Sequence, residues 1–433
     1  MTTKPTLILV CLLAPLVSGA APLDGYGRLM GKTVLMSATV PDVALSDSPA
    51  DATNAIARIE SVLAGKGMEV VQDGPEFVRV FPKAARGSLT NAPLRGAELA
   101  PPTRADTKGS GLIDFVNADL NQVLAIYAVL SRRTVLRPGM LPAAMITLHS
   151  QCALTSEEVV YAIATVLALN GIAMVDDGPK FVQAVPVWQR AATGAPKAEP
   201  GATLLPAGSI NFSRADLSQV LACYAAMRQR TMLRPANLPL PSVDLKYETA
   251  LTREEALYAM TKVFELNGIG VVDDGATFIQ AVPMALRGQV TPRAPAPEPG
   301  AKLFNPREVP ALGASHPPGP RTEVEHLERD LEHMRQAFYE FMRLPDPAKR
   351  SARRLLTLYA VLAGKTAVQS RDFDGAAIWF HVETPLTKRE LLYAIETTLA
   401  LDSLMIVPVD DQHIRLGWMR AEPKRVGSPQ PKK

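Results

Sequence analysis

Few residues in this chain are of a type and spacing that could do chemistry. Its six histidines are His149, His316, His326, His333, His381 and His413. None of them clusters with cysteine or acidic residues at the spacing that a metal site requires. His326 and His333 can share one helix face, but two ligands do not make a site, and we interpret them as solvated helix residues.

Two aspartate pairs, Asp176-Asp177 and Asp273-Asp274, raise the question of acid–base catalysis or calcium binding. The further acids of a calcium loop are missing. No Gly-rich phosphate loop follows a strand, and no Ser, Cys or His nucleophile arrangement is present. We therefore expect no catalytic, cofactor-binding or metal-ligating residues, no cofactor and no enzymatic activity. An exported hydrolase with an unrecognised site is kept as the last alternative.

Both pairs lie in a phrase that the chain contains twice, LNGIAMVDDGPKFVQAVP from Leu169 and LNGIGVVDDGATFIQAVP from Leu266. Residues 111–186 align with 208–283 without a gap, and about half of the positions are identical. Asp-Gly tolerates the positive φ angles of a two-residue hairpin turn. We therefore interpret Asp177-Gly178 as a turn between strands at 172–175 and 181–185, and the phrase as a duplicated turn rather than a duplicated site.

Two weaker copies flank the duplicated pair. In the last copy, Tyr359-Ala360-Val361-Leu362 repeats Tyr127-Ala128-Val129-Leu130, although its opening strand is not recognisable. In the first, shortened copy, Thr33-Val34-Leu35 echoes Thr134-Val135-Leu136. Units of this length form separate domains more often than a stacked solenoid, so we expect domains on flexible linkers.

Each full unit is predicted to run strand, helix, strand, strand, helix, strand, strand. In the first full unit, residues 119–132 have helical apolar spacing, and 113–116, 134–136 and 145–149 suit strands. Capping boxes mark the start of the second helix at Thr155-x-x-Glu158, Thr252-x-x-Glu255 and Thr387-x-x-Glu390, with a weaker version at Ser48-x-x-Asp51. Asn170-Gly171 then ends that helix.

Composition separates these units. The 37 prolines of the 433 residues cluster between them, as in extended spacers. The net charge of +3 gives no domain-wide basic field, so we expect no nucleic-acid partner. The predicted division is a signal peptide at 1–20, domains at 24–82, 109–187, 207–284 and 321–420, linkers at 83–108, 188–206 and 285–320, and a basic tail at 421–433.

The first twenty residues have the layout of a secretory signal peptide. One lysine precedes the apolar run Thr6–Val17, and Ser18-Gly19-Ala20 suits cleavage after Ala20. The run is too short for a membrane span, and we expect no direct transmembrane insertion. Cys152 and Cys223 occupy non-equivalent positions, so two unpaired cysteines are favoured over a disulfide, which stays open.

A charged stretch, residues 321–344, is predicted to be helical. Its apolar stripe consists of Val324, Leu327, Leu331, Met334, Phe338 and Phe341. Such a stripe packs on its own domain or pairs with a partner helix, and we favour packing on its own domain.

The repeats resemble the periplasmic N-terminal repeat domains of bacterial secretins of type II secretion and type IV pilus systems. The resemblance is carried by Phe115-Val116-Asn117-Ala118-Asp119-Leu120 with Leu136-Arg137-Pro138, by Leu154-Thr155-x-x-Glu158 through Asn170-Gly171, and by Val182–Pro186. It implies tandem small KH-like (βαββαββ) α+β domains. It also implies rings in the periplasm that contact neighbouring subunits, platform proteins and exported substrates.

The chain departs from secretins because no run of alternating strands follows Val309 that could close a pore. KH modules that bind RNA use a Gly-x-x-Gly loop, which is also missing. The resemblance therefore predicts a non-enzymatic periplasmic adaptor or scaffold, possible as a homo-oligomer, associated with an outer-membrane complex. Its expected partners are a secretin, other secretion or pilus proteins, and exported substrate. The alternative is a cell-envelope protein that binds peptidoglycan or another wall polymer.

Overall fold

The computed structural model describes residues 23–41, 52–86, 111–189, 193–196, 201–296, 298–306, 323–343, 351–373 and 375–419. The predicted signal peptide, the cap at Ser48–Asp51 and the basic tail lie outside these residues. The fold is mixed α+β, as predicted. The chain divides into two compact units, Met1–Val135 with Leu141–Gly194, and Leu136–Met140 with Ala195–Lys433.

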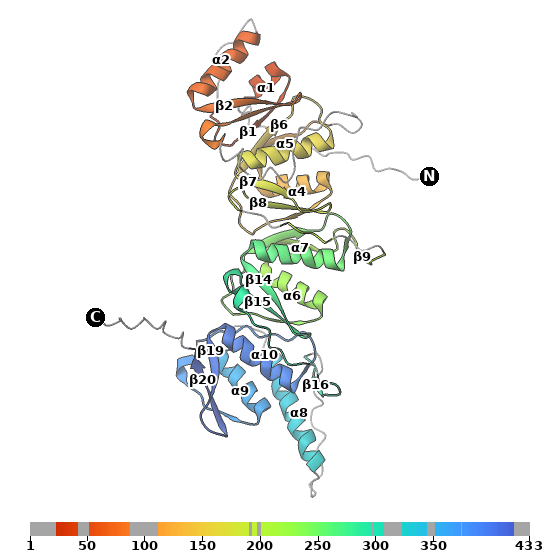
Figure 1. The fold of residues 1–433 in the computed structure, drawn as a ribbon, viewed down its shortest axis with the longest axis vertical. Coiled ribbons are helices and arrows are strands. Elements are labelled where there is room, and N and C mark those ends of the chain that lie inside the picture. Colours follow the sequence, from red (N-terminus) through yellow and green to blue (C-terminus); the bar gives the residue numbers. More distant parts are fainter. Residues whose placement is uncertain are drawn as a thin grey trace, which may run out of the picture. The chain divides into compact units, whose positions relative to one another are not determined.

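The first unit holds the first two repeats. The first repeat contains α1 (Asp24–Met30), β1 (Thr33–Met36), α2 (Ala52–Gly65), β2 (Met68–Asp73), β3 (Phe77–Pro82) and the short 3-10 helix η1 (Lys83–Ala85). The second contains β4 (Asp114–Asp119), α4 (Leu120–Ser131), β5 (Thr134–Leu136), β6 (Met145–His149), α5 (Ser156–Leu169), β7 (Ile172–Asp176) and β8 (Phe181–Pro186). The second repeat therefore has the predicted order of elements (Figure 1).

The second unit holds the other two repeats. The third repeat contains β10 (Asn211–Asp216), α6 (Leu217–Arg228), β11 (Thr231–Leu233), β12 (Ser242–Lys246), β13 (Leu251–Thr252), α7 (Arg253–Leu266), β14 (Ile269–Asp274), β15 (Phe278–Pro283) and η3 (Met284–Gln289). The fourth contains α8 (Glu323–Met342), α9 (Ala352–Ala363), β17 (Thr366–Ala367), η5 (Arg371–Phe373), β18 (Leu386–Thr387), α10 (Lys388–Leu401), β19 (Leu404–Pro408) and β20 (His413–Trp418).

All four repeats share one sheet topology. The three-stranded sheets have the orders β1-β3-β2, β5-β8-β7, β11-β15-β14 and β17-β20-β19. One backbone hydrogen bond also recurs, from the N–H of Thr33, Thr134, Thr231 and Thr366 to the carbonyl of Glu76, Lys180, Thr277 and Gln412, respectively. The two weaker copies are therefore the same unit as the two full ones, including the first, where α1 takes the place of a longer helix.

Local signals explain the second helix of each repeat. The capping boxes at Thr155, Thr252 and Thr387 are all formed, with both the hydroxyl and the glutamate hydrogen bonds present. These bonds satisfy backbone N–H groups that a helix start leaves without partners. The residue after the helix cap has positive φ in every repeat, and it is glycine except in the fourth, where Ser403 has φ 63°.

The Asp-Gly hairpin differs from the predicted two-residue turn. Asp274 pairs with Phe278, so the loop between β14 and β15 has three residues, Gly275 to Thr277. Only the glycine has positive φ, 69° at Gly275. The aspartate is therefore the last residue of the strand, and the alternation of the strand determines where its side chain points.

The predicted linkers contain short strands. Within 188–206, β9 (Leu204–Leu205) pairs with β13, and within 285–320, β16 (Leu303–Phe304) pairs with β18. An isolated bridge between Gly111 and Leu154 occupies the equivalent place in the second repeat. These segments therefore end as an added strand beside the capping box of the repeat that follows.

Within each unit, the two repeats share a hydrophobic core, in contrast to the expected separate domains. One face of the first sheet carries Val78 and Val80, which pack with Ile59 and Leu63 of α2. Its other face carries Leu35 and Phe77, and these belong to the core of the second repeat. In the second unit, Leu233 and Phe278 of the third repeat likewise belong to the core of the fourth. Burying both faces of a sheet requires a cover for the second face, and the next repeat supplies it.

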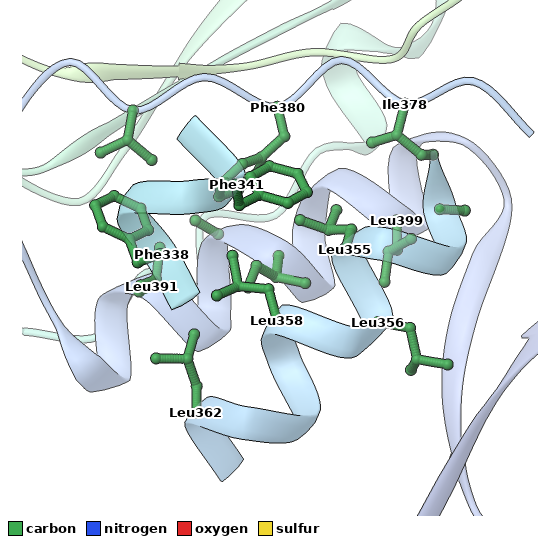
Figure 2. Packing of buried hydrophobic residues seen from close by; sticks show 14 of the residues in the cluster. Phe338, Phe341, Leu355, Leu356, Leu358, Leu362, Ile378, Phe380, Leu391 and Leu399 are labelled. Atoms are coloured by element: carbon green, nitrogen blue, oxygen red, sulfur yellow. The ribbon is translucent and has the colours of Figure 1, made fainter. Parts of the chain in front are cut away.

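The α8 helix packs on its own repeat, as predicted. Phe338 and Phe341 are buried, and Leu331 and Met334 pack against the same cluster. Figure 2 shows both phenylalanines beside Leu355 and Leu358 of α9. Phe338 contacts Phe304 edge to face, with the ring centroids 6.0 Å apart. The helix thus covers the α9 surface of a repeat whose described residues include no strand equivalent to β4 or β10.

Candidate functional site: the junctions between repeats

The two aspartates of each pair are directed to opposite sides. Asp273 is exposed and pairs with Arg228 and Arg230, whereas Asp274 is fully buried. In the second repeat Asp176 pairs with Arg133, and Asp177 is buried. Successive residues of a strand point to opposite faces, so the carboxylates of one pair do not share a site. This arrangement is unsuited to a carboxylate pair that shares a proton or an ion.

The buried Asp274 is held by four hydrogen bonds. Its Oδ1 accepts the backbone N–H groups of Arg293 and Ala294 at 2.8 and 3.0 Å. Its Oδ2 accepts Nε2 of Gln280 at 2.7 Å and the hydroxyl of Tyr393 at 2.5 Å. A buried carboxylate is tolerated because these donors replace water. One side chain therefore joins the third sheet, the segment that follows it, and the fourth repeat.

The other two copies of this aspartate share parts of that arrangement. Asp177 accepts the N–H of Gly194 at 2.8 Å and Nε2 of Gln183 at 2.7 Å. Asp73 accepts the Tyr161 hydroxyl at 2.5 Å and pairs with Nε of Arg79 at 3.0 Å. The repeated phrase is therefore more than a turn, because its second aspartate anchors a following segment, a following repeat, or both.

Each tyrosine also packs its ring on a phenylalanine of the preceding repeat. The ring centroids of Phe77 and Tyr161 are 5.3 Å apart, and those of Phe278 and Tyr393 are 5.5 Å apart, both with planes at 48°. Burial is the main cause that raises the pKa of Tyr393 to about 12, and the hydrogen bond to Asp274 adds to it. The same two causes raise the pKa of Tyr161. Both hydroxyls thus remain protonated donors at neutral pH.

A second polar contact between the repeats forms at the C-terminal end of α5 and of α10, the helices that carry Tyr161 and Tyr393. Oδ1 of Asn170 accepts the N–H of Ala38 at 2.8 Å, and Oδ1 of Asp402 accepts the N–H of Ala236 at 2.9 Å. Asn170 and Asp402 are the C-cap residues of α5 and α10. The helix that carries the tyrosine is therefore held on the preceding repeat near both of its ends.

The third contact between the repeats involves the threonine that opens the edge strand β1 or β11 of the three-stranded sheet. Oγ1 of Thr33 accepts the N–H of Gln151 at 3.3 Å, and Oγ1 of Thr231 lies 2.9 Å from Oγ1 of Thr384. Thr277 adds a hydrogen bond to Oε1 of Glu390, the capping-box acid of α10. The same threonine position therefore takes part in the junction of both units, with a backbone N–H as its partner in the first unit and a hydroxyl in the second.

The junction in the second unit also contains a buried cation. The guanidinium of Arg234 lies 4.1 Å from the ring centre of Trp379, and Arg234 is only 5% exposed. Burial lowers the pKa of Arg234 to about 10, against the raising influence of Asp216 and Asp402. The pKa of Asp402 is raised, chiefly by burial. The opposite charges and the indole ring make this cation tolerable inside the junction.

The histidines are spread over the described residues. His333 is exposed on α8, and Nδ1 of His413 lies 2.8 Å from Asp410. His149 lies between Asp24 and Asp114, beside a shallow hollow of the first unit lined by Leu23, Asp24, Val34, Met36, Thr147, His149 and Gln151. His316 and the side chain of His326 lie outside the described residues.

The described residues contain no group of three His, Cys, Asp or Glu side chains that could hold a metal ion. Neither Cys152 nor Cys223 forms a disulfide, and Sγ of Cys152 donates to Glu76 at 3.0 Å. Burial raises the pKa of the Cys223 thiol. Within the described part of the chain, no helix has the length and apolarity needed to cross a membrane.

Comparisons with protein-family models, with curated proteins and with solved structures gave no match to this chain. Sequence reasoning identified the repeats and their capping boxes but missed the junction residues Tyr161, Tyr393, Gln183 and Gln280. The signal that could have found them is the recurrence of Tyr-Ala early in the second helix and of Gln at the centre of the last strand of the two full repeats.

Proposed function

We propose that this protein is a non-enzymatic periplasmic adaptor or scaffold of a type II secretion or type IV pilus-like machine. It would bind partner proteins through four KH-like domains of the secretin N-terminal type. The observation that carries the proposal is the repeated junction, in which buried polar groups such as Asp274 and Tyr393 join one α/β repeat to the next. The buried polar residues at these junctions thus hold neighbouring repeats in position, as expected of a scaffold protein.

Two further features support a binding role. The second repeat has the strand–helix–strand–strand–helix–strand–strand order that the resemblance to secretin domains implies, and the third has it with the two-residue strand β13 added before α7. Linked modules that each bind weakly gain effective concentration when a ring of partners presents repeated sites. The chain offers four modules, paired in two units. A pair that shares a core presents its surfaces at a constant spacing.

The alternative is a cell-envelope protein that binds a wall polymer. Sugar-binding surfaces of that kind would be marked by a cluster of exposed aromatic side chains. Among the described residues, Trp188 and Trp418 are the strongly exposed large aromatic side chains, at 79% and 55%, and they belong to different units. This alternative therefore ranks second.

The test is recovery of partners from crosslinked cell envelopes with the tagged full chain. We expect a secretin or a pilus platform protein among the crosslinked partners. Recovery of wall fragments alone would overturn the proposal. A second measurement uses the purified chain in a planar lipid bilayer, where we expect no conductance, and a stable pore would contradict the assignment as an adaptor.

A further inference from the structure

The fourth repeat has a sheet face that corresponds to the junction face of the first and third repeats. Strand pairing places Thr366 opposite His413, as Thr33 lies opposite Phe77 and Thr231 opposite Phe278. We define the terminal sheet face as Thr366, Val368, Met405, Val409, His413 and Arg415. The alternate residues of β20, Ile414 and Leu416, point into the core.

The equivalent positions differ sharply in exposure. In the third repeat, Thr231, Leu233 and Phe278 are at most 1% exposed. In the fourth, Val368, the counterpart of Leu233, is 42% exposed. Val409, the counterpart of the fully buried Asp274, is 52% exposed, and Met405 on the same face is 44% exposed. The first and third repeats owe their burial to the repeat that follows, whereas no described residue covers the terminal sheet face. Three apolar side chains on one sheet face are thus open to solvent.

The chemistry of this face has also changed. His413 stands where the first and third repeats have Phe77 and Phe278, and Val409 stands where they have the buried aspartates. A tyrosine hydroxyl docked as Tyr393 is on Asp274 would lose its acceptor here. An apolar side chain on the docking helix fits Val409 better, because a buried hydroxyl without a partner costs free energy.

Besides an apolar side chain over Val409, a docking partner needs a group that neutralises the charge of Arg415. In the first repeat the equivalent Arg79 pairs with Asp73 on the same face. With Val409 in place of that aspartate, exposed Arg415 has no carboxylate partner among the described residues. A docking partner would therefore satisfy Arg415 with an acidic side chain, which makes the pairing selective.

A second copy of this chain does not meet these requirements. The free helix of the first repeat, α2, is as long as α5 and would be the one to dock. At the place of Tyr161 it has Ala57, and at the place of Asn170 it has Lys66, both exposed. Ala57 is too small to cover the apolar side chains of the terminal sheet face. Lys66 at the helix end is a cation and therefore cannot pair with Arg415.

We propose that the terminal sheet face docks an α/β domain of another protein, which lays on it a helix with an apolar side chain over Val409 and an acidic side chain against Arg415. This inference rests on the proposed adaptor function, for which it names the contact surface and the class of partner. It follows from continuity with two junctions of the same chain, where the same face receives a helix of an α/β repeat.

The test places a photoreactive amino acid on the face of the full chain in cells, as Val368→benzoylphenylalanine, and maps the adducts by mass spectrometry. The control is Val116→benzoylphenylalanine, at an exposed position of β4. We expect Val368 adducts to a helix of an α/β domain in another protein. Adducts to residues 420–433, to a second copy or to a protein of another fold would overturn the proposal, as would a yield no higher than the control.

Charge reversal tests the acidic partner. Arg415→Glu should lower the adduct yield about tenfold or more, because like charges then face each other. Arg415→Lys should retain most of the yield, and Arg371→Glu, an exposed reversal outside this face, should leave it unchanged. An unaffected yield in Arg415→Glu would refute the pairing.

The outcomes distinguish failure of the docking face from failure of the proposed function. Adducts to an α/β partner unrelated to secretion or pili would support the docking face and contradict the proposed function. Recovery of a secretin from envelopes without any Val368 adducts would support the proposed function and contradict the docking face.

Discussion

The hydroxyl of Tyr393 donates a 2.5 Å hydrogen bond to Oδ2 of Asp274, a carboxylate 119 residues earlier in the chain with no exposed surface. Tyr161 and Asp73 form the same pair in the first unit. In both cases the tyrosine ring lies on a phenylalanine that neighbours the aspartate across the hairpin. Two repeats joined in this way should unfold together, because their cores are continuous.

Loss of the hydroxyl tests this joint. Tyr393→Phe leaves Asp274 with one donor fewer inside the protein. We expect a loss of about 1.5–3 kcal/mol in the free energy of unfolding, the range for a hydrogen bond to a charged group. Urea unfolding followed by circular dichroism measures it. Tyr359→Phe is the matched control, since that hydroxyl binds Glu396 at the exposed surface of one repeat. Equal losses in the two variants would contradict a special role for the junction.

The hydrogen bonds from Arg293 and Ala294 to Asp274 should protect the Pro-rich segment after β15 from proteolysis. Asp274 accepts the N–H of Arg293 and the N–H of Ala294, and the second is the amide of the bond that trypsin would cleave after Arg293. Asp274→Ala should accelerate cleavage after Arg293 about tenfold or more, because local opening then costs less free energy. Mass spectrometry of a time course measures the rate. Asp273→Ala, the exposed neighbour, should cleave at the wild-type rate, and equal acceleration by both variants would disprove the anchor.

The capping boxes should contribute separately to each repeat. Thr252→Ala removes the acceptor for the backbone N–H of Glu255, and we expect a cost of about 1 kcal/mol. The midpoint of thermal or urea unfolding reports it. Thr261→Ala, in the middle of the same helix, should change stability by less than about 0.5 kcal/mol, since alanine has the better helix propensity. A larger loss at Thr261 than at Thr252 would be inconsistent with the cap.

Alkaline pH should weaken the second unit. The pKa of Tyr393 is about 12 in the folded chain, against 10 as its ordinary value. Below pH 10 the hydroxyl is protonated in both states, and its contribution to stability is fully present. Between pH 10 and 12 only the unfolded chain loses the proton, so the free energy of unfolding falls as pH rises. Between pH 8 and 12, the unfolding midpoint of Tyr393→Phe should fall less steeply with pH than that of the wild type. Parallel pH dependences of the two proteins would contradict this prediction.

The attachment of α8 can be tested in its aromatic contacts. Phe338 is 2% exposed and packs against Phe304, so Phe338→Ala should cost about 3–5 kcal/mol. The adjacent Tyr339 is only half-buried and stacks with Arg343. Tyr339→Ala should therefore cost less than about 1 kcal/mol. Similar unfolding midpoints for the two variants would show that α8 does not belong to the core of the fourth repeat.

Much of each repeat could be predicted because its signals are local. The hydroxyl and acid of Thr155-x-x-Glu158 lie one helical turn apart, and the strand at 134–136 was predicted with the bounds that the structure has. The hairpin at Asp177 was placed correctly, but four residues, Asp177 to Lys180, lie between β7 and β8, and three lie between β14 and β15, rather than two. The prediction took Asp-Gly to be the turn itself, whereas Asp274 completes its strand and only Gly275 has positive φ in that loop.

By itself, the sequence determined the number of repeats, the order of their elements and the ends of their second helices, since these depend on neighbours within a few residues. Only the tertiary structure decided what Asp274 does, because its burial and its bond to Tyr393 depend on a repeat more than one hundred residues away. The same reason applies to Val409 and Arg415. Their exposure follows from which sheet face has a following repeat to cover it, and no local pattern carries that information.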